Sequence, residues 1–248
     1  MPIGVYLMDN NNDDNTNAAS DAIDIEAERE EGERLRNLLN PEQARVFEAV
    51  MNAVHDPHAP NCLFLLDAAA GSGKSFLFQT LISVLRGEDT PLIAMAPTGL
   101  TASLLKGGRT LHSRFKIPLD VNETTTTGVS PTSTDGRLIA AAKLIITDEI
   151  SMVNKTIFDL VERGLRGIST DNRPFANKAV IIAGDFRQTL PALLNANRQT
   201  IVDSCMKGSR NFHAFQRHDL QVNVRTRGDE QHFSAWLIEL GNGMLPPL

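Results

Sequence analysis

The segment of the sequence best suited to chemistry is 68–75, which reads AAAGSGKS. It follows a short apolar run and precedes a helical pattern, which is the setting that a phosphate-binding loop requires. Glycines in such a loop let backbone N–H groups curl around phosphates, and the following helix adds its N-terminal dipole. The pattern therefore predicts an ATP-binding loop. Its predicted members are Ala70, Gly71, Ser72, Gly73, Lys74 and Ser75.

Two side chains in this segment are suited to bind the nucleotide phosphates and a metal ion. Lys74 can reach the β- and γ-phosphates of a nucleotide, and the Ser75 hydroxyl can ligate Mg²⁺. The strict form of the pattern begins with glycine, whereas this sequence has Ala68 at that position. The alternative is a glycine-rich turn that binds nothing, which the strand–loop–helix context disfavours.

Two carboxylates, Asp148 and Glu149, follow the apolar run 144–147. A bare Asp-Glu pair is most often solvated surface charge, but behind a buried strand and downstream of a phosphate loop a functional role is preferred. We expect Asp148 to hold Mg²⁺ through its water shell, opposite Ser75, and Glu149 to orient and polarise the attacking water.

A further apolar run, 179–183, precedes the sequence GDFRQ at 184–188. Gln188 is placed to contact the γ-phosphate or the attacking water. Two interpretations stay open for Asp185 and Arg187, which could form an internal ion pair or act directly at the nucleotide.

Basic, hydroxyl and aromatic residues are mixed in the stretch 107–116, which reads GGRTLHSRFK. Grooves for single-stranded nucleic acid have this composition, because hydroxyls and N–H groups take phosphates and aromatic faces stack bases. Equally, Phe115 could be core and the basic residues merely solvated. Together with residues after the run 91–96, the candidate DNA-binding residues are Pro97, Thr98, Gly99, Thr110, His112, Arg114, Phe115 and Lys116.

Short apolar runs alternate with helical patterns along the body of the chain. A helix is predicted to begin at Pro41 with Asn40 as its cap. Strands that are apolar on both faces, separated by helices, imply an α/β fold with a parallel sheet sandwiched by helices. Ligands in such sheets bind at the carboxyl ends of the strands. The predicted strands are 62–66, 91–96, 144–147, 179–183 and 220–224, and the other predicted helices are 76–86 and 154–168.

Negative charge is concentrated at the start of the chain. The net charge of the 248 residues is −6, but residues 1–34 contain ten Asp/Glu and two Arg (2 − 10 = −8), which leaves +2 for the remainder. The composition predicts a disordered acidic tail over 1–34, in which 26–36 could form a frayed helix, and a folded domain over 35–226. The Thr/Ser-rich segment 120–137 lacks periodicity and is predicted to be a mobile surface loop. A near-neutral body can still present a basic groove to nucleic acid.

Several classes of protein are disfavoured by the sequence. The apolar runs fall short of the roughly 18–20 residues that a membrane span needs. Cys62 and Cys205 are far apart, so a disulfide framework is not indicated. His55, His58 and Cys62 lack a fourth ligand at finger-like spacing, which disfavours a zinc site.

Together these segments resemble the Pif-type DNA helicases (the petite-integration-frequency family), including the helicases of rolling-circle transposons. The resemblance runs from about residue 39 to the end of the chain. Its most specific pieces are DEISMV at 148–153 and GDFRQTLP at 184–191, and the stretch 110–119 matches the transposon-type branch closely.

The resemblance implies a RecA-like P-loop NTPase domain of an ATP-dependent helicase that uses Mg²⁺ and moves five-prime to three-prime on single-stranded or forked DNA. Gln43 falls in the family's adenine-reading motif, and Arg225 falls where an arginine finger approaches the γ-phosphate. Pro97, Thr98, Thr110 and His112 fall where the family touches single-stranded DNA. Members act in DNA repair, recombination and telomere maintenance, in nuclei and mitochondria. A nuclear monomer without a membrane partner is expected, with a mitochondrial location as the alternative.

The family pattern continues into a second RecA-like domain, and no match to the motifs of that domain is found here. The chain is therefore expected to be truncated, with 227–248 as the start of a connection, to hydrolyse ATP slowly at best and to unwind no duplex. One alternative is a fragment that binds ATP and DNA without turnover. Another is a small-molecule P-loop kinase, although the Asp-Glu pair suits hydrolysis better than transfer to an acceptor.

Overall fold

A parallel sheet of six strands forms the centre of the structure, in the order β3-β2-β4-β5-β1-β6. The computed structural model describes residues 23–56, 58–59, 61–169, 171–188, 191–193, 195–224, 233, 236, 239–241 and 243–244. The strands are β1 (Leu63–Ala68), β2 (Leu92–Ala96), β3 (Arg109–Thr110), β4 (Leu144–Thr147), β5 (Ala179–Gly184) and β6 (Gln216–Leu220). The predicted α/β class is confirmed.

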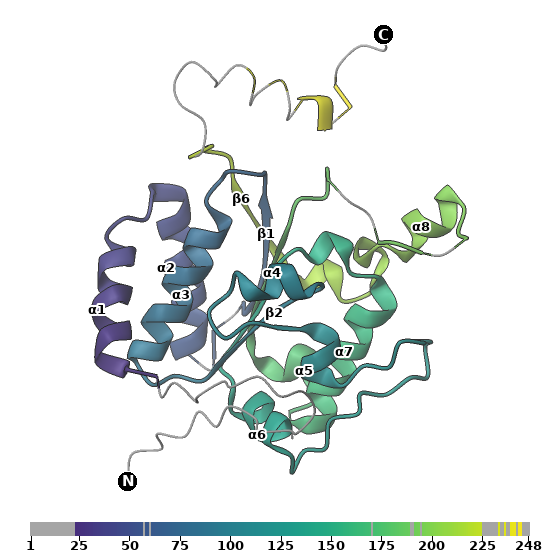
Figure 1. Ribbon diagram of the computed structural model, residues 1–248, viewed down its shortest axis with the longest axis horizontal. Helices are drawn as coiled ribbons and strands as arrows, with labels where there is room; N and C mark the ends of the chain where they lie inside the picture. Colours follow the sequence, from purple (N-terminus) through teal and green to yellow (C-terminus); the bar gives the residue numbers. More distant parts are fainter. Residues whose placement is uncertain are drawn as a thin grey trace.

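Helices connect and cover the strands (Figure 1). They are α1 (Ile25–Arg36), α2 (Pro41–His55), α3 (Lys74–Gly87), α4 (Gly99–Ser103), α5 (Leu111–Phe115), α6 (Thr134–Ala141), α7 (Lys155–Ile168) and α8 (Arg198–Ser204). Short 3-10 turns lie at Ile150–Met152, Pro174–Asn177, Met206–Gly208 and Phe212–Ala214. Across the described ranges, each helix is too short or too polar to cross a membrane.

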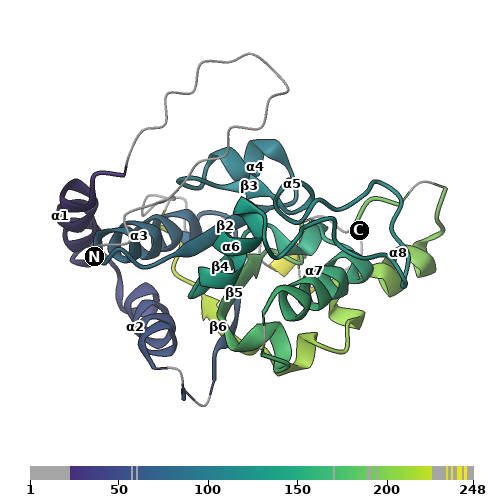
Figure 2. The ribbon, with the colours of Figure 1, turned by 90° about the horizontal axis from the view of Figure 1, so that it is seen from below.

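The sheet is buried on both faces because its central strands are apolar at nearly every position. Leu144 and Ile146 pack into the core beneath α2 and α3, whereas Ile145, between them, packs into the core beneath α7. This alternation follows from the two-residue period of a strand. Figure 2 shows the two layers, with α2 and α3 on one side of the sheet and α7 on the other.

Helix α1 corrects the expectation that the acidic tail extends to residue 34. Its first turn is capped by Asp24, and its buried residue Leu35 faces the rest of the domain. Two glycines allow close backbone approach to α3: a Cβ on Gly32 would lie 2.9 Å from the backbone nitrogen of Val84, and one on Gly87 would lie 2.6 Å from the Cα of Arg29. The ordered fold therefore begins before the predicted boundary.

Two other predictions differ from the structure. The last strand is Gln216–Leu220 rather than 220–224, and it is an edge strand with mostly exposed side chains. The segment 120–137, predicted to be an irregular surface loop, ends in the first turn of α6, where Asp135 is buried. The two-residue strand β3 has no apolar pattern and was not predicted.

Candidate nucleotide and DNA-binding sites

The phosphate loop joins the end of β1 to the start of α3, as predicted. Gly71 and Gly73 have φ values of 84° and 82°, a backbone region that glycine adopts readily and other residues rarely do. A Cβ at Gly73 would lie 2.3 Å from the Nε2 atom of Gln43, so a larger residue here would also displace the Gln43 amide. Among the described residues, the buried Oγ of Ser72 has no hydrogen-bond partner.

Lys74, at the start of α3, lies between the two carboxylates that follow β4. Its Nζ is 2.6 Å from Asp148 Oδ1 and 2.6 Å from Glu149 Oε1. Burial alone would lower the pKa of Lys74, but the two carboxylates outweigh burial and raise it above its usual value. Burial raises the pKa of Asp148, and the Lys74 ammonium offsets this only in part. The structure thus brings together the three residues predicted from separate motifs.

The backbone after β4 turns sharply to present both carboxylates. Asp148 continues the ladder, since its N–H donates to the carbonyl of Met95 at 2.9 Å. Glu149 has a φ of 50°, the left-handed region that non-glycine residues adopt at some cost. The Glu149 N–H donates to Asp148 Oδ1 at 2.8 Å, which fixes the first carboxylate relative to the second.

Gln43 lies against the phosphate loop and is almost fully buried. It forms a capping box with Asn40: its Oε1 accepts from the Asn40 N–H at 3.0 Å, while its own N–H donates to Asn40 Oδ1. Its Nε2 donates to the Gly73 carbonyl at 3.2 Å. The predicted base-reading residue is therefore next to the loop, with both ends of its amide bonded to protein.

Glu42 is a residue of this site that the sequence patterns did not single out. Its Oε2 accepts from the N–H groups of Gln221 and Val222, at 2.9 and 3.1 Å. Two residues further on, the Val224 N–H donates to the Gly71 carbonyl at 2.9 Å. Glu42 thereby holds the 221–224 segment over the phosphate loop. Arg225, the predicted arginine finger, lies outside the described residues.

The residues after β5 form a chain of ion pairs. Of the two interpretations left open for Asp185 and Arg187, the structure shows the internal ion pair. Arg187 Nε lies 2.8 Å from Asp185 Oδ1, and its NH2 group lies 3.1 Å from Asp67 Oδ1 on β1. Gln188 Nε2 donates to Asp185 Oδ2 at 3.0 Å. Asp67 had no distinguishing pattern in the sequence.

A cavity of about 500 Å³ opens beside these groups, within the size range of nucleotide and other small-ligand sites. It is bounded by the phosphate loop, by the ends of β5 and β6 and by residues near the end of the chain. The residues that line it are Ala69, Ala70, Ser72, Asp185, Arg187, Gln188, Gln221, Asn223, Leu240 and Gly241.

The candidate DNA-binding residues divide into two groups. Ala96 of β2 pairs with Thr110 of β3, so the sheet places Pro97 and Thr98 beside Thr110. Thr98 caps α4 and Thr110 caps α5 through their side-chain oxygens. Pro97, Thr98, Thr110 and His112 are partly exposed and Gly99 is exposed, so all five remain available to a ligand.

Arg114 and Phe115 were predicted to bind DNA, and the structure shows that this prediction is wrong for both. Phe115 is fully buried in the core beneath α7, so it has no free face for a base. Arg114 is also buried, and its NH1 lies 3.0 Å from Asp135 Oδ1. The spacing of Leu111, Arg114 and Phe115 (i, i+3, i+4) is that of one buried helix face and could have indicated this. Lys116 is 43% exposed in its side chain and stays a candidate.

A parallel sheet with a phosphate loop after one strand and a carboxylate pair after another defines a RecA-like P-loop NTPase domain. Within that class, the chain belongs to the PIF1-like helicase family, whose family model matches residues 38–247.

Curated relatives match parts of this chain. ATP-dependent DNA helicase RRM3 of Saccharomyces cerevisiae is 32% identical over 169 residues, which are 66% of this chain and 23% of that helicase. ATP-dependent DNA helicase Pif1 of Bdellovibrio bacteriovorus is 31% identical over 191 residues, which are 75% of this chain and 40% of that protein. The chain thus spans less than half the length of either relative.

Solved structures of Pif1 helicases have the same fold. The Bacteroides Pif1 helicase in complex with ADP-AlF3 and single-stranded DNA superposes with a TM-score of 0.68 at 27% identity, over 84% of this chain and 47% of that chain. The Pif1 helicase from Candida albicans gives a TM-score of 0.67 at 25% identity, over 84% of this chain and 45% of that one.

Proposed function

We propose that this chain binds ATP with Mg²⁺ and couples ATP hydrolysis to movement on single-stranded DNA, as a RecA-like motor domain of a DNA helicase. The observation that carries this is the Lys74 ammonium, 2.6 Å from carboxylate oxygens of both Asp148 and Glu149 at the phosphate loop. ATP hydrolysis needs a cation for the phosphates, an oxygen ligand for the metal and a group that orients water, all at one point. Relatives named as ATP-dependent DNA helicases support the proposal.

Mg²⁺ fits the donor set of this site. The ion prefers hard oxygen ligands and keeps several of its waters. Asp148 offers a buried carboxylate at the sheet edge, and Ser75 offers a hydroxyl in the first turn of α3. We assign the ion to these two residues. When bound, Mg²⁺ neutralises charge on the phosphate oxygens.

The remaining residues have separate roles in this scheme. Lys74 turns from the carboxylates to the β- and γ-phosphates, and Glu149 then orients and polarises the attacking water. Gln188, held by Asp185, is placed to contact the γ-phosphate or that water. Arg225 is assigned as the arginine finger from the family resemblance.

Adenine recognition by Gln43 has a specific structural requirement. The Gln43 Nε2 donates to the carbonyls of Gly73 and Ser72, at 3.2 and 3.5 Å, so both of its N–H groups are engaged and a bond from Nε2 to the base must replace one of these contacts. Both are longer than the 3.0 Å bond that Oε1 accepts from Asn40, so the Nε2 contacts are the easier ones to give up. We therefore assign Nε2 as the group that turns to the base, which would couple base recognition to the phosphate loop.

Single-stranded DNA is assigned to the edge formed by the ends of β2 and β3. Thr98, Thr110 and His112 supply hydroxyl and imidazole groups there, and Lys116 supplies an exposed charge. Groups of this kind bind the sugar–phosphate backbone and carry little sequence information. Movement from five-prime to three-prime and action on forked duplexes follow from the family resemblance. Pif1 structures with single-stranded DNA and at forked double-stranded DNA support the partner class.

Steady-state ATP hydrolysis by the purified chain, with and without single-stranded DNA, tests the proposal. Phosphate release that requires Mg²⁺ and rises with DNA is expected. Nucleotide and DNA binding without turnover would favour the alternative of a non-hydrolysing fragment of a transposon-type helicase. Failure to bind Mg-ATP at all would overturn the assignment.

The cellular setting is proposed from the resemblance alone. We propose a nuclear protein of DNA repair, recombination or telomere maintenance that acts as a monomer. Fluorescence imaging of the tagged chain tests the location, and light scattering of the purified chain tests the monomeric state. One solved Pif1 structure is described as two coordinating helicases, so a dimer on forked DNA is the outcome that would correct the monomer.

A further inference from the structure

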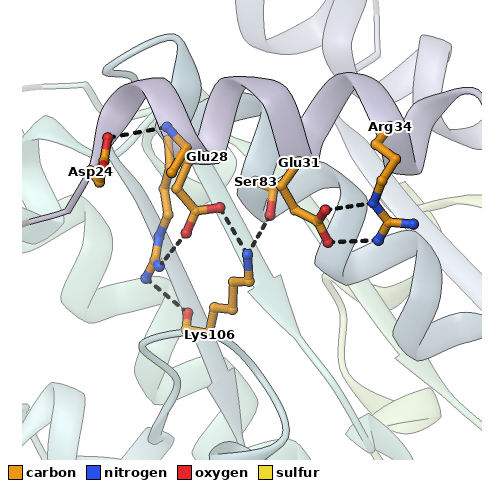
Figure 3. A network of polar contacts seen from close by, with 8 residues as sticks. Asp24, Glu28, Glu31, Arg34, Ser83 and Lys106 are labelled. Carbon is orange, nitrogen blue, oxygen red and sulfur yellow. Dashed lines mark hydrogen bonds and ion pairs between the residues drawn. The ribbon is translucent and has the colours of Figure 1, made fainter.

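Glu28 of α1 occupies an enclosed position between two basic side chains from other parts of the chain. Its Oε1 lies 3.2 Å from NH1 of Arg86, near the end of α3, and its Oε2 lies 2.8 Å from Nζ of Lys106. The Lys106 Nζ also donates to the Oγ of the fully buried Ser83, at 2.7 Å. Figure 3 shows the resulting network, which joins α1, α3 and the loop after α4.

The same network holds the backbone of that loop. Arg86 NH2 donates to the Lys106 carbonyl at 3.1 Å. Gly107, the next residue, has a φ of 66°, and a Cβ there would lie 2.5 Å from the same guanidinium nitrogen. The guanidinium therefore lies directly against the loop, and Glu28 fixes the guanidinium by its charge.

The loop connects the two threonines assigned to DNA. It follows α4, which Thr98 caps, and leads within a few residues to Thr110, which caps α5. Gly108 packs closely on the end of α4, since a Cβ there would lie 2.3 Å from the Ala102 carbonyl oxygen. Only the two-residue pairing of β2 with β3 otherwise sets Thr110 beside Thr98, so a displacement of the loop would pull on that short pairing and shift the two threonines relative to each other.

We propose that Glu28 is a positioning residue for single-stranded DNA: its carboxylate holds the 104–108 loop so that Thr98 and Thr110 present one continuous backbone-binding edge. Because the two threonines are assigned to DNA only under the function proposed above, this role rests on that function. The acidic helix that precedes the motif-bearing part of the chain thereby becomes part of the DNA-binding machinery.

Electrostatics explain why a carboxylate is needed at this place. Without Glu28, the Arg86 guanidinium and the Lys106 ammonium would face each other with no carboxylate between them, and like charges at short range repel. The carboxylate is also held firmly, because the Gly32 and Gly87 contacts fix α1 on α3. Its loss would therefore release the loop rather than be absorbed by a shift of α1.

Glu28→Gln and Glu31→Gln form a matched pair for the test. Both substitutions remove one negative charge from the same helix, but among the described residues Glu31 gives no support to the loop: its ion pair is with Arg34 of the same helix, at 2.7 Å, and the Lys106 charge is the weakest of the influences on its pKa. Affinity for a fluorescent oligothymidylate is measured by anisotropy for the wild-type chain and both variants. Affinity for a Mg-bound fluorescent ATP analogue is measured on the same samples.

The sign of the effect separates positioning from simple charge. Removing negative charge from a DNA-binding protein strengthens phosphate binding or leaves it unchanged. We expect Glu28→Gln to weaken DNA binding instead, by about 3- to 30-fold, the range for residues that act through another. Glu31→Gln is expected to match wild type or to bind slightly tighter. Nucleotide affinity is expected to stay within about twofold in both, because the phosphate loop is at the far end of α3.

The possible results distinguish a failure of the proposed function from a failure of the role proposed for Glu28. If the wild-type chain binds no single-stranded DNA, the proposed function fails. If it binds and the two variants behave alike, the role of Glu28 is refuted while the proposed function stands. Glu28→Gln combined with Lys106→Gln gives a second measurement: if Glu28 acts through Lys106, the double variant loses less affinity than the product of the two single losses. If the double variant loses as much affinity as the product of the two single losses, Glu28 does not act through Lys106 and the proposed mechanism is refuted.

Discussion

Substitution of Glu149 by Gln separates nucleotide binding from hydrolysis at this site. The Glu149 side chain is one of the two carboxylates on Lys74, and Asp148 remains in contact with that ammonium at 2.6 Å after the change. Gln has almost the same shape as Glu and retains the turn geometry, but its amide is a far weaker base. Mg-ATP should therefore still bind, while the attacking water loses its general base.

The expected magnitudes follow from the two kinds of interaction. Loss of a general base typically slows turnover by about 10²–10⁴-fold, which corresponds to roughly 3–5 kcal/mol of barrier. The stability of the fold should fall by only about 1 kcal/mol, because Asp148 stays paired with the Lys74 ammonium and the amide oxygen of the new glutamine can still accept a hydrogen bond from it. Catalysis and stability are thus predicted to change by very different amounts.

Single-turnover hydrolysis with excess protein measures the chemical step directly, and equilibrium binding of a fluorescent ATP analogue measures affinity. Glu123→Gln, in the exposed part of the 120–133 segment, makes the same charge change away from the site and serves as the control. Turnover within tenfold of wild type would refute the assignment of Glu149 as the group that positions water. Loss of nucleotide binding would show that its main role is to hold Lys74.

Three further changes test other parts of the structure. Lys74→Ala should lower Mg-ATP affinity by about 10- to 150-fold for each charge-assisted hydrogen bond lost. Calorimetric titration measures this affinity, and an unchanged value would contradict the assignment of the phosphate loop. Gly73→Ala places a Cβ 2.3 Å from the Gln43 amide at a φ of 82° and should lower Tm and nucleotide affinity together, whereas Gly167→Ala on α7, where a Cβ meets nothing within 4 Å, should do neither. Burial alone would raise the pKa of Glu28, but its basic neighbours lower it below 4.5. The stability that Glu28 adds over Gln should therefore be complete above pH 4.5 and disappear as the pH falls through its lower folded-state pKa, as acid titration of both forms will test.

The strands that the sequence predicted well are those buried on both faces. The run 144–147 coincides with β4, in which each side chain is buried, and its short length favours a strand over a helix. β6 could not be found this way. It reads QRHDL, lies at the edge of the sheet, and is recognisable as a strand only through its backbone pairing with β1.

Residues 25–36 show why composition misled at the start of the chain. Acidic residues outnumber apolar ones there, which is typical of a solvated tail. Besides the buried Leu35, α1 is fixed by close packing at Gly32 and by a largely buried ion pair at Glu28, and neither of these two contacts depends on apolar area. Both depend on where α3 lies, which is information that a local pattern does not contain.

Strand ends explain why the candidate nucleotide-site residues could be grouped from the sequence. In a parallel sheet, the residues that follow different strands arrive at one edge, so Lys74, Asp148 and Gln188 could be assigned to one site from their positions alone. The residues of the same chain that contact and hold this site could not be assigned in this way. That Glu42 holds the 221–224 segment is set by how α2 and β6 lie against the loop, and that Asp67 receives Arg187 is set by the pairing of β1 with β5.

The stretch 109–116 shows how basic composition can overstate a DNA-binding surface. Arg109, Arg114 and Lys116 all lie within 3.3 Å of the buried Asp135 carboxylate, so part of their charge is already compensated inside the protein. A buried carboxylate needs such partners, because an unpaired charge there would be strongly destabilising. The positive charge left for phosphates is therefore smaller than the sequence suggests. Hydroxyl and backbone groups near Thr98 and Thr110 must then supply more of the DNA contact, and contacts of that kind release few counterions. A DNA edge built in this way depends more on the geometry of its loop than on net charge, which is why a single carboxylate that holds the loop matters to it.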